Sequence, residues 1–179
     1  MKFLPRPYQD LIANAGLDCR RLNIFASVGV GKTSASYLLF DKLRMFGEAK
    51  KAVVFAPKRV ALSAWTAERT KWVETFGHLK VVAAIGTPAQ RLAALHADAD
   101  ILTINYENIP WLIETLGDQW PFDTVFADES TRVASVRVSL QTSKLGNEYM
   151  RSQGSKRANL LAKTAITKVR NWYNLTGSP

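Results

Sequence analysis

The feature that most constrains this chain is the stretch from Phe25 to Ser34, Phe-Ala-Ser-Val-Gly-Val-Gly-Lys-Thr-Ser. Residues 22–25, which are apolar except for Asn23, predict a buried strand, and residues 34–43 have the spacing of a helix. The glycines therefore fall in a strand-to-helix turn, where backbone N–H groups and the helix N-terminus can converge on phosphate oxygens. The sequence thus predicts a phosphate-binding loop.

The side chains of this loop fit the P-loop pattern Gly-x-x-x-x-Gly-Lys-Ser/Thr, except that Ala26 replaces the first glycine. Alanine is compatible with this position if its φ is negative. Lys32 is placed to reach the terminal phosphates, and the Thr33 hydroxyl can ligate Mg²⁺. We expect the nucleotide to be bound by Gly29, Gly31, Lys32, Thr33 and Ser34. The competing interpretation is a glycine-rich turn that precedes Lys-Thr by chance.

Nearly uniform apolar runs alternate with helical patterns along the rest of the chain. Such runs are typical of strands buried on both faces of a parallel sheet. Strands are expected over 51–56, 80–85, 100–105, 124–129 and from 172, and helices over 6–16, 60–76, 87–96, 106–116 and 156–170. The alternation predicts the α/β class, a three-layer domain with a mainly parallel central sheet. Residues 1–179 are expected to form one domain, with a mobile loop over 141–155.

Two acidic residues, Asp128 and Glu129, end the strand expected over 124–129. Ligands of parallel sheets bind at the carboxyl ends of the strands, so this pair and the phosphate-binding loop should meet at one edge. A helix N-cap is the competing interpretation of an acid pair after a strand. The loop favours the catalytic interpretation.

The net charge of +9 is concentrated near the C-terminus of the chain. Residues 132–179 hold 9 of the 24 Lys and Arg residues but 1 of the 15 acidic residues, a net +8. This asymmetry indicates a polyanionic partner, although a solvated basic face would have the same composition. No apolar run approaches the about 18 residues of a membrane span. We expect a cytoplasmic protein without a membrane partner, in the host cytoplasm if the protein is viral.

In order and spacing, these stretches resemble the first RecA-like lobe of a superfamily 2 helicase or translocase. The resemblance is nearer to Swi/Snf-type remodellers and their phage relatives than to DEAD-box RNA helicases. It covers almost the whole chain and is carried by Pro7-Tyr8-Gln9, residues 26–33, Ala56-Pro57-Lys58 with Trp65 and Trp72, Asn105-Tyr106-Glu107, Asp128-Glu129-Ser130-Thr131 and Leu175-Thr176-Gly177-Ser178-Pro179.

The resemblance implies an ATP hydrolase with ATP and Mg²⁺ as cofactors. Gln9 would read adenine, and Lys32 and Thr33 would hold phosphates and metal. Asp128 would bind the metal through water, and Glu129 would orient or deprotonate the attacking water. Ser130 and Thr131 depart from the usual Ala-His or Ala-Asp, which puts the coupling of hydrolysis to movement in question.

The resemblance also implies a nucleic-acid track, DNA rather than RNA. Nucleic-acid contacts are expected from Pro57, Lys58, Asn105 and Tyr106 and, in the basic segment, from Arg151, Lys156 and Arg157. Thr176, Gly177 and Ser178 would couple hydrolysis to motion. In this family a second lobe, in cis or in trans, supplies the arginine finger, so the isolated lobe should hydrolyse ATP slowly. A nucleotide-binding module without turnover is the alternative, and a P-loop kinase fits least well.

Overall fold

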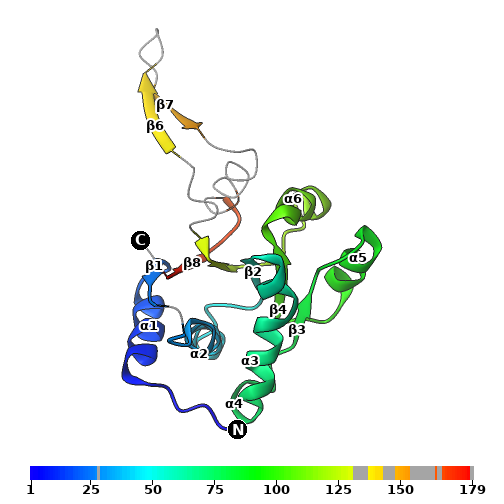
Figure 1. Cartoon of the computed structure of the whole chain (residues 1–179). Helices are drawn as coiled ribbons and strands as arrows, with labels where there is room; N and C mark the ends of the chain where they lie inside the picture. The colour runs from blue at the N-terminus through cyan, green and yellow to red at the C-terminus, as the bar shows by residue number, and fades with distance from the viewer. Residues whose placement is uncertain (28, 131–136, 143–147, 154–163, 165–166, 178–179) are drawn as a thin grey trace.

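The computed structural model describes residues 1–27, 29–130, 137–142, 148–153, 164 and 167–177. Its main sheet has six strands in the order β1-β8-β5-β2-β4-β3, and every neighbouring pair is parallel (Figure 1). The strands are β1 (Arg21–Phe25), β2 (Ala52–Ala56), β3 (Val81–Ala83), β4 (Ile101–Asn105), β5 (Thr124–Asp128) and β8 (Asn171–Thr176). The α/β class and the parallel sheet are confirmed.

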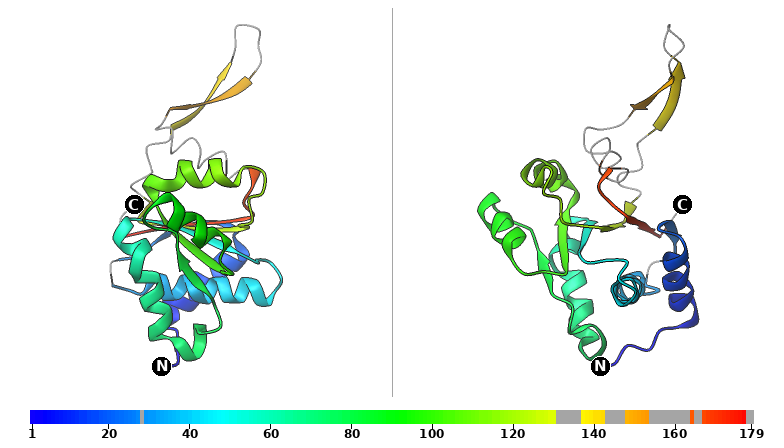
Figure 2. Two further views of the ribbon diagram at one scale, coloured as in Figure 1. Left: turned by 90° about the vertical axis from the view of Figure 1, so that its right-hand side faces the viewer. Right: turned by 180° about the vertical axis from the view of Figure 1, so that it is seen from behind.

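Helices cover both faces of the sheet, which gives the expected three layers (Figures 1 and 2). One face packs α1 (Pro7–Asp18), α2 (Lys32–Met45), α3 (Trp65–Lys71) and α4 (Val73–Phe76), and the other packs α5 (Pro88–His96) and α6 (Ile109–Leu116). Successive side chains of a strand point to opposite faces. Val54 of β2 therefore joins the first core, while its neighbours Val53 and Phe55 join the second.

The expected helix over 60–76 is divided in the structure. It begins as a π-helix, η1 (Val60–Ala64), continues as α3, and resumes as α4 after Trp72. The expected helix over 106–116 begins as a 3₁₀ turn, η2 (Tyr106–Asn108), before α6. Thr87 is the N-cap of α5, because its hydroxyl accepts a hydrogen bond from the Gln90 N–H.

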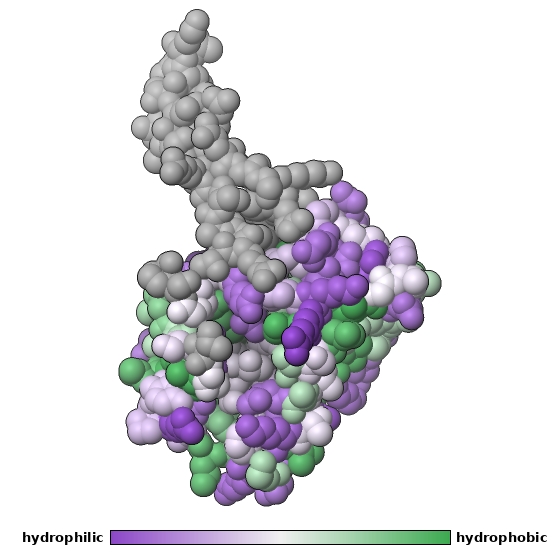
Figure 3. All heavy atoms as spheres, viewed as in Figure 1, coloured by the Kyte–Doolittle hydropathy of each residue, from purple (hydrophilic) through white to green (hydrophobic). Residues whose placement is uncertain are grey.

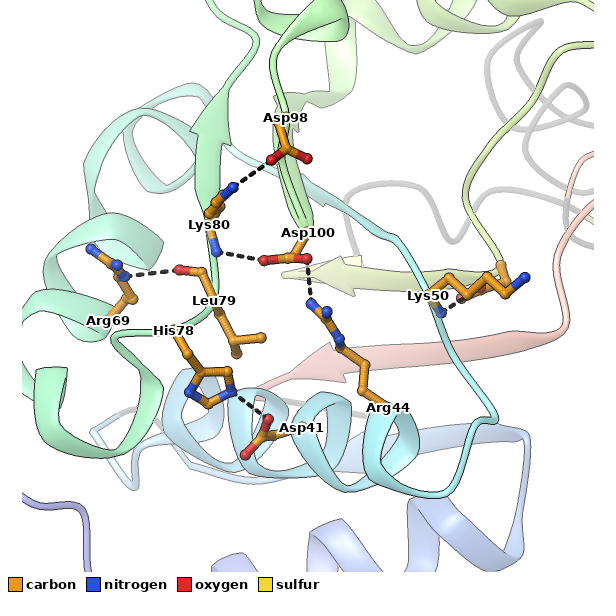
Figure 4. A network of polar contacts seen from close by, with 10 residues as sticks. Asp41, Arg44, Lys50, Arg69, His78, Leu79, Lys80, Asp98 and Asp100 are labelled. Atoms are coloured by element: carbon orange, nitrogen blue, oxygen red, sulfur yellow. Dashed lines mark hydrogen bonds and ion pairs between the residues drawn. The ribbon is translucent and has the colours of Figure 1, made fainter.

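A polar network ties together the amino-terminal ends of the strands (Figure 4). Asp100, just before β4, accepts from the Lys80 N–H at 2.7 Å and pairs with Arg44 near the end of α2. His78 Nε2 lies 2.7 Å from Asp41 Oδ1, and Arg69 Nε donates a hydrogen bond to the Leu79 carbonyl at 2.9 Å. These contacts fix α2 and α3 against the sheet at this edge and leave the carboxyl ends of the strands for ligands.

Part of the segment expected to be a loop over 141–155 is strand. The strands β6 (Arg137–Thr142) and β7 (Glu148–Gln153) pair antiparallel in a separate two-stranded sheet. Residues 141–142 and 148–153 of the expected loop are therefore strand, and 143–147 and 154–155 lie outside the described residues. In β6, Val138 and Leu140 alternate with polar residues, which is the period of a strand. Most of the helix expected over 156–170 lies outside the described residues. None of the helices in the described part combines the length and hydrophobicity needed to cross a bilayer.

Candidate functional site

The phosphate-binding loop joins β1 to α2 and depends on its glycines for its shape. Gly29 has φ 85° and Gly31 has φ 79°, conformations in which a side chain is strained. Gly31 is the N-cap of α2, so the helix begins at Lys32 with its N-terminal N–H groups directed at the loop. Ala26 is not among the described residues with positive φ, which is the condition that the alanine had to meet.

Lys32 folds back over the loop. Its Nζ donates to the carbonyl of Ala26 at 2.7 Å and to that of Ser27 at 3.1 Å. These carbonyls hold the ammonium at the mouth of the loop, where phosphate oxygens would be stronger acceptors because they carry charge.

The strand register brings the loop and the acid pair to one edge. Phe25 at the end of β1 pairs with Thr176 of β8, and Leu175 of β8 pairs with Asp128 at the end of β5. The Ala26 N–H donates to the Thr176 carbonyl at 3.0 Å, which fixes the start of the loop to β8. β8 thus lies between the loop strand and the acidic strand and connects them.

Asp128 is a buried carboxylate, 7% exposed. Its Oδ2 accepts a hydrogen bond from Trp65 Nε1 at 3.2 Å, and its backbone carbonyl accepts one from the Tyr106 hydroxyl at 2.6 Å. Burial raises the pKa of the Asp128 carboxyl, and the charge of Glu129 acts in the same direction. The hydrogen bond from Trp65 and the charge of Lys32 lower this pKa and offset only part of the rise.

Glu129 follows in a different environment. It is exposed and has φ 55°, the one positive φ among the described residues other than glycine. A non-glycine residue in this region is strained by about 1–3 kcal/mol, and such strain gathers at functional sites. The turn separates the two carboxylates, with Asp128 held inside and Glu129 turned to the solvent side.

A pocket of about 200 Å³ lies beside the loop, between the N-terminal segment, α1 and the end of α3. We call it the N-terminal pocket; it is lined by residues 29–31 and by Leu4, Tyr8, Gln9, Glu68 and Trp72, among others. Gln9 is 5% exposed and donates from Nε2 to the carbonyls of Val30 and Gly31 at 3.2 and 3.3 Å. The predicted adenine-reading glutamine therefore lies in a pocket that opens onto the phosphate-binding loop.

Sequence reasoning missed the outer wall of the N-terminal pocket. Glu68 is not among the predicted site residues, yet it is half-buried and accepts hydrogen bonds from the Ser34 hydroxyl and from Trp72 Nε1. Phe3 is buried against Trp72, with ring centroids 5.3 Å apart. The spacing of Trp65, Glu68 and Trp72, which places all three on one helical face, was the available signal.

A second pocket, of about 450 Å³, opens at the carboxyl ends of β2, β3 and β4. This strand-end pocket is lined by Lys58, Gly86, Thr87, Arg91, Asn105 and Asn108, among others. Arg91 donates to the Gly86 carbonyl at 2.9 Å and lies over the Trp111 ring, 4.4 Å from its centroid. Figure 3 shows hydrophilic residues gathered on the upper part of the described surface, around α6, with hydrophobic residues in small separate groups.

The residues predicted to contact nucleic acid are divided by the structure. Lys58 and Asn105 line the strand-end pocket, and Pro57 is half-buried beside Lys58. Tyr106 is 2% exposed and its hydroxyl is bonded inside the core, so a direct contact of this side chain with nucleic acid is wrong for this conformation. The Tyr106 hydroxyl reaches the backbone carbonyl of Asp128 instead of solvent.

Other predicted residues lie near the edge or outside the described chain. Thr176 is buried beside the loop, and Gly177 is exposed just after β8. Ser178, Lys156 and Arg157 lie outside the described residues, and Arg151 belongs to β7.

The donor set at the strand edge fits Mg²⁺. This ion takes oxygen ligands, keeps several waters, and is held by one or two carboxylates together with substrate phosphates. Thr33 in the first turn of α2 and Asp128 at the end of β5 supply a hydroxyl and a carboxylate. The described residues contain no preformed group of three or more His, Cys, Asp or Glu side chains that could hold a metal.

The chain is similar to known proteins in sequence in one case and in fold in others. No family model matches the chain. It is 43% identical over 179 residues to protein p41 of Acyrthosiphon pisum secondary endosymbiont phage 1, across 99% of this chain and 36% of p41. The chain therefore spans about a third of the length of that relative.

Two solved structures are similar in fold. One is the Sulfolobus solfataricus SWI2/SNF2 ATPase core in complex with dsDNA, with a TM-score of 0.70 and 18% identity over 100% of this chain and 33% of that chain. The other is the ATP-dependent Type ISP restriction-modification enzyme LlaBIII bound to DNA, with a TM-score of 0.61 and 18% identity over 98% of this chain and 13% of that chain. The chain has the RecA-like α/β fold of the SWI2/SNF2 ATPase core.

Proposed function

We propose that this chain is the ATP-binding and ATP-hydrolysing lobe of a DNA translocase or helicase of superfamily 2. The observation that carries the proposal is the strand register, which brings Ala26, Thr176 and Asp128 to neighbouring strand ends. The similar ATPase core and the Type ISP enzyme, both named as DNA complexes, support nucleic acid as the partner.

In this proposal each residue at the carboxyl ends of the strands and in the adjoining loop has one role. Gln9 reads the base from the N-terminal pocket, and Lys32 exchanges its carbonyl partners for the β- and γ-phosphate oxygens. Thr33 and Asp128 hold Mg²⁺, which neutralises charge on the phosphates when it is bound. Glu129, on the solvent side, orients or deprotonates the attacking water.

The strand-end pocket is proposed as part of the DNA track. Lys58 supplies positive charge, and the amides and hydroxyl of the pocket supply hydrogen-bonding groups for a phosphodiester backbone. A second lobe would supply the arginine that stabilises the transition state. Such arginines contribute on the order of 10³–10⁵ in rate, so we expect slow hydrolysis by residues 1–179 alone.

Two variants test the proposal on folded protein. Lys32→Ala should abolish ATP binding measured by calorimetry, because it removes the ammonium that meets the phosphates. Glu129→Gln should bind ATP with the parent affinity and lose single-turnover hydrolysis. Unchanged ATP affinity in Lys32→Ala would refute the nucleotide site. Binding without hydrolysis in the parent chain, even with duplex DNA and a second lobe, would support a nucleotide-binding module instead.

A further inference from the structure

Two buried side chains hold Asp128 in place. Trp65 is fully buried and donates from Nε1 to the carboxylate, while Tyr106 donates from its hydroxyl to the backbone carbonyl of the same residue. A buried indole N–H or phenol needs a partner, and losing one costs the desolvation of the group left behind. Asp128 is thus fixed at its side chain and at its backbone by two donors that do not reach solvent.

Both donors come from segments that line the strand-end pocket. Lys58 of the pocket is separated from Trp65 by little more than the π-helix η1, and Asn105 of the pocket directly precedes Tyr106. Asn108, at the end of the same 3₁₀ turn, donates to the Asn105 side chain at 2.6 Å. The segment 58–65 therefore lines the pocket at one end and holds Asp128 at the other, while in the segment 105–108 Tyr106 holds Asp128 from between two pocket residues.

The π-helix is anchored so that Trp65 has one position. The Thr103 hydroxyl donates to the Ala61 carbonyl at 2.5 Å, which ties η1 to β4, and the Tyr37 hydroxyl donates to the Trp65 carbonyl at 2.8 Å. π-Helical turns are rare and occur often at functional sites. Here the wide turn delivers the indole to a carboxylate 63 residues away in the chain.

We propose that Trp65 and Tyr106 are positioning residues for Asp128, and that they connect its orientation to the occupancy of the strand-end pocket. The proposal rests on the proposed function. A phosphodiester backbone bound at Lys58 and Asn105 contacts the two segments that carry Trp65 and Tyr106, so any shift of these segments on binding is passed to Asp128 through the two hydrogen bonds. By linkage, DNA and Mg²⁺-nucleotide tighten each other's binding by the same factor.

The first experiment measures the affinity of a fluorescent ADP with Mg²⁺ and with EDTA. Trp65→Phe keeps an aromatic side chain in the core and removes the indole N–H donor. The increase in ADP affinity on adding Mg²⁺ should therefore be about 10-fold smaller, as for other groups that orient metal ligands, while the affinity in EDTA is unchanged. Trp120→Phe is the matched control, because Trp120 Nε1 donates to the Phe122 carbonyl at 2.8 Å away from the edge. If Mg²⁺ increased the ADP affinity of these two variants by the same factor, the proposed role of Trp65 would be overturned.

The second experiment repeats the measurement with saturating duplex DNA. The parent chain should bind Mg²⁺-ADP more tightly with DNA, and the double variant Trp65→Phe/Tyr106→Phe should lose this gain. Its DNA affinity without nucleotide is measured beside the parent's, so that a loss of DNA binding is told apart from a loss of coupling. Tyr173→Phe, which removes a buried hydroxyl bonded to the Gly16 carbonyl, should keep the gain.

The outcomes separate the two proposals. A double variant that keeps the full DNA-dependent gain would overturn the connection to the pocket. Thermal unfolding of each variant checks that the fold persists. If Trp65→Phe does not fold, the DNA-dependent increase in Mg²⁺-ADP affinity is measured on Tyr106→Phe alone. Failure of the parent chain to bind ADP at all would instead refute the proposed function.

Discussion

The side-chain amide of Gln9 closes over Gly31: its Nε2 lies 3.3 Å from the Gly31 carbonyl, and a Cβ added at Gly31 would lie 2.5 Å from that nitrogen. The base-reading candidate and the N-cap of the phosphate-binding helix therefore contact each other directly. The glycine is required both by its positive φ and by the space that Gln9 occupies.

Gly31→Ala should destabilise the fold more than Gly29→Ala. Both positions have positive φ, so each variant carries about 1–3 kcal/mol of backbone strain. Only at Gly31 does the added methyl meet Gln9, because nothing lies within 4 Å of a Cβ at Gly29. Urea unfolding measures the difference, and adding Gln9→Ala should remove it. Equal losses in the two alanine variants would contradict the contact.

Asp128→Asn should stabilise the metal-free protein at neutral pH. A carboxyl whose folded pKa is raised favours folding below its ordinary pKa, and that contribution is lost as pH rises through the folded pKa. Asparagine removes the buried charge and still offers an oxygen to Trp65. Thermal unfolding in EDTA should show an advantage for the variant that appears as pH rises above the ordinary carboxyl pKa of about 4 and levels off above the raised folded pKa. An advantage independent of pH would contradict the burial effect.

Lys58→Ala should weaken DNA binding and reduce its salt dependence. Each phosphate contact adds about one to the slope of log affinity against log salt, so the slope should fall by about one. Lys80→Ala is the control, since Lys80 is exposed at the opposite edge of the sheet and pairs with Asp98 (Figure 4). Fluorescence anisotropy at several salt concentrations measures both slopes. A parallel fall in the two variants would indicate a nonspecific charge effect.

Phe3→Ala should destabilise the protein by about 3 kcal/mol, because it removes a buried ring from the contact with Trp72 and Phe76. Leu4→Ala next to it should change stability by less than about 0.5 kcal/mol, since Leu4 is 75% exposed. Chemical denaturation compares the two. Similar small effects would mean that the N-terminal segment does not hold the wall of the N-terminal pocket.

Local sequence patterns were sufficient for the loop, the strands and the sheet class. Gly29 and Gly31 have the positive φ that a strand-to-helix turn requires, and apolar runs such as 52–56 became strands buried on both faces. These features depend on residues a few positions apart, where backbone geometry and burial period act directly. The hairpin of β6 and β7 was missed because its alternating apolar residues, Val138 and Leu140, are few among the polar residues around them.

Tertiary structure alone decided which side chains meet at the edge. The sequence could not place β8 between β1 and β5, because strand order depends on how the whole sheet packs. Nor could it indicate that Trp65 donates to Asp128, that Glu68 holds Ser34, or that Tyr106 is buried. Each of these contacts joins residues at least 22 positions apart or depends on a π-helical turn, and only the folded core brings such groups within hydrogen-bonding distance.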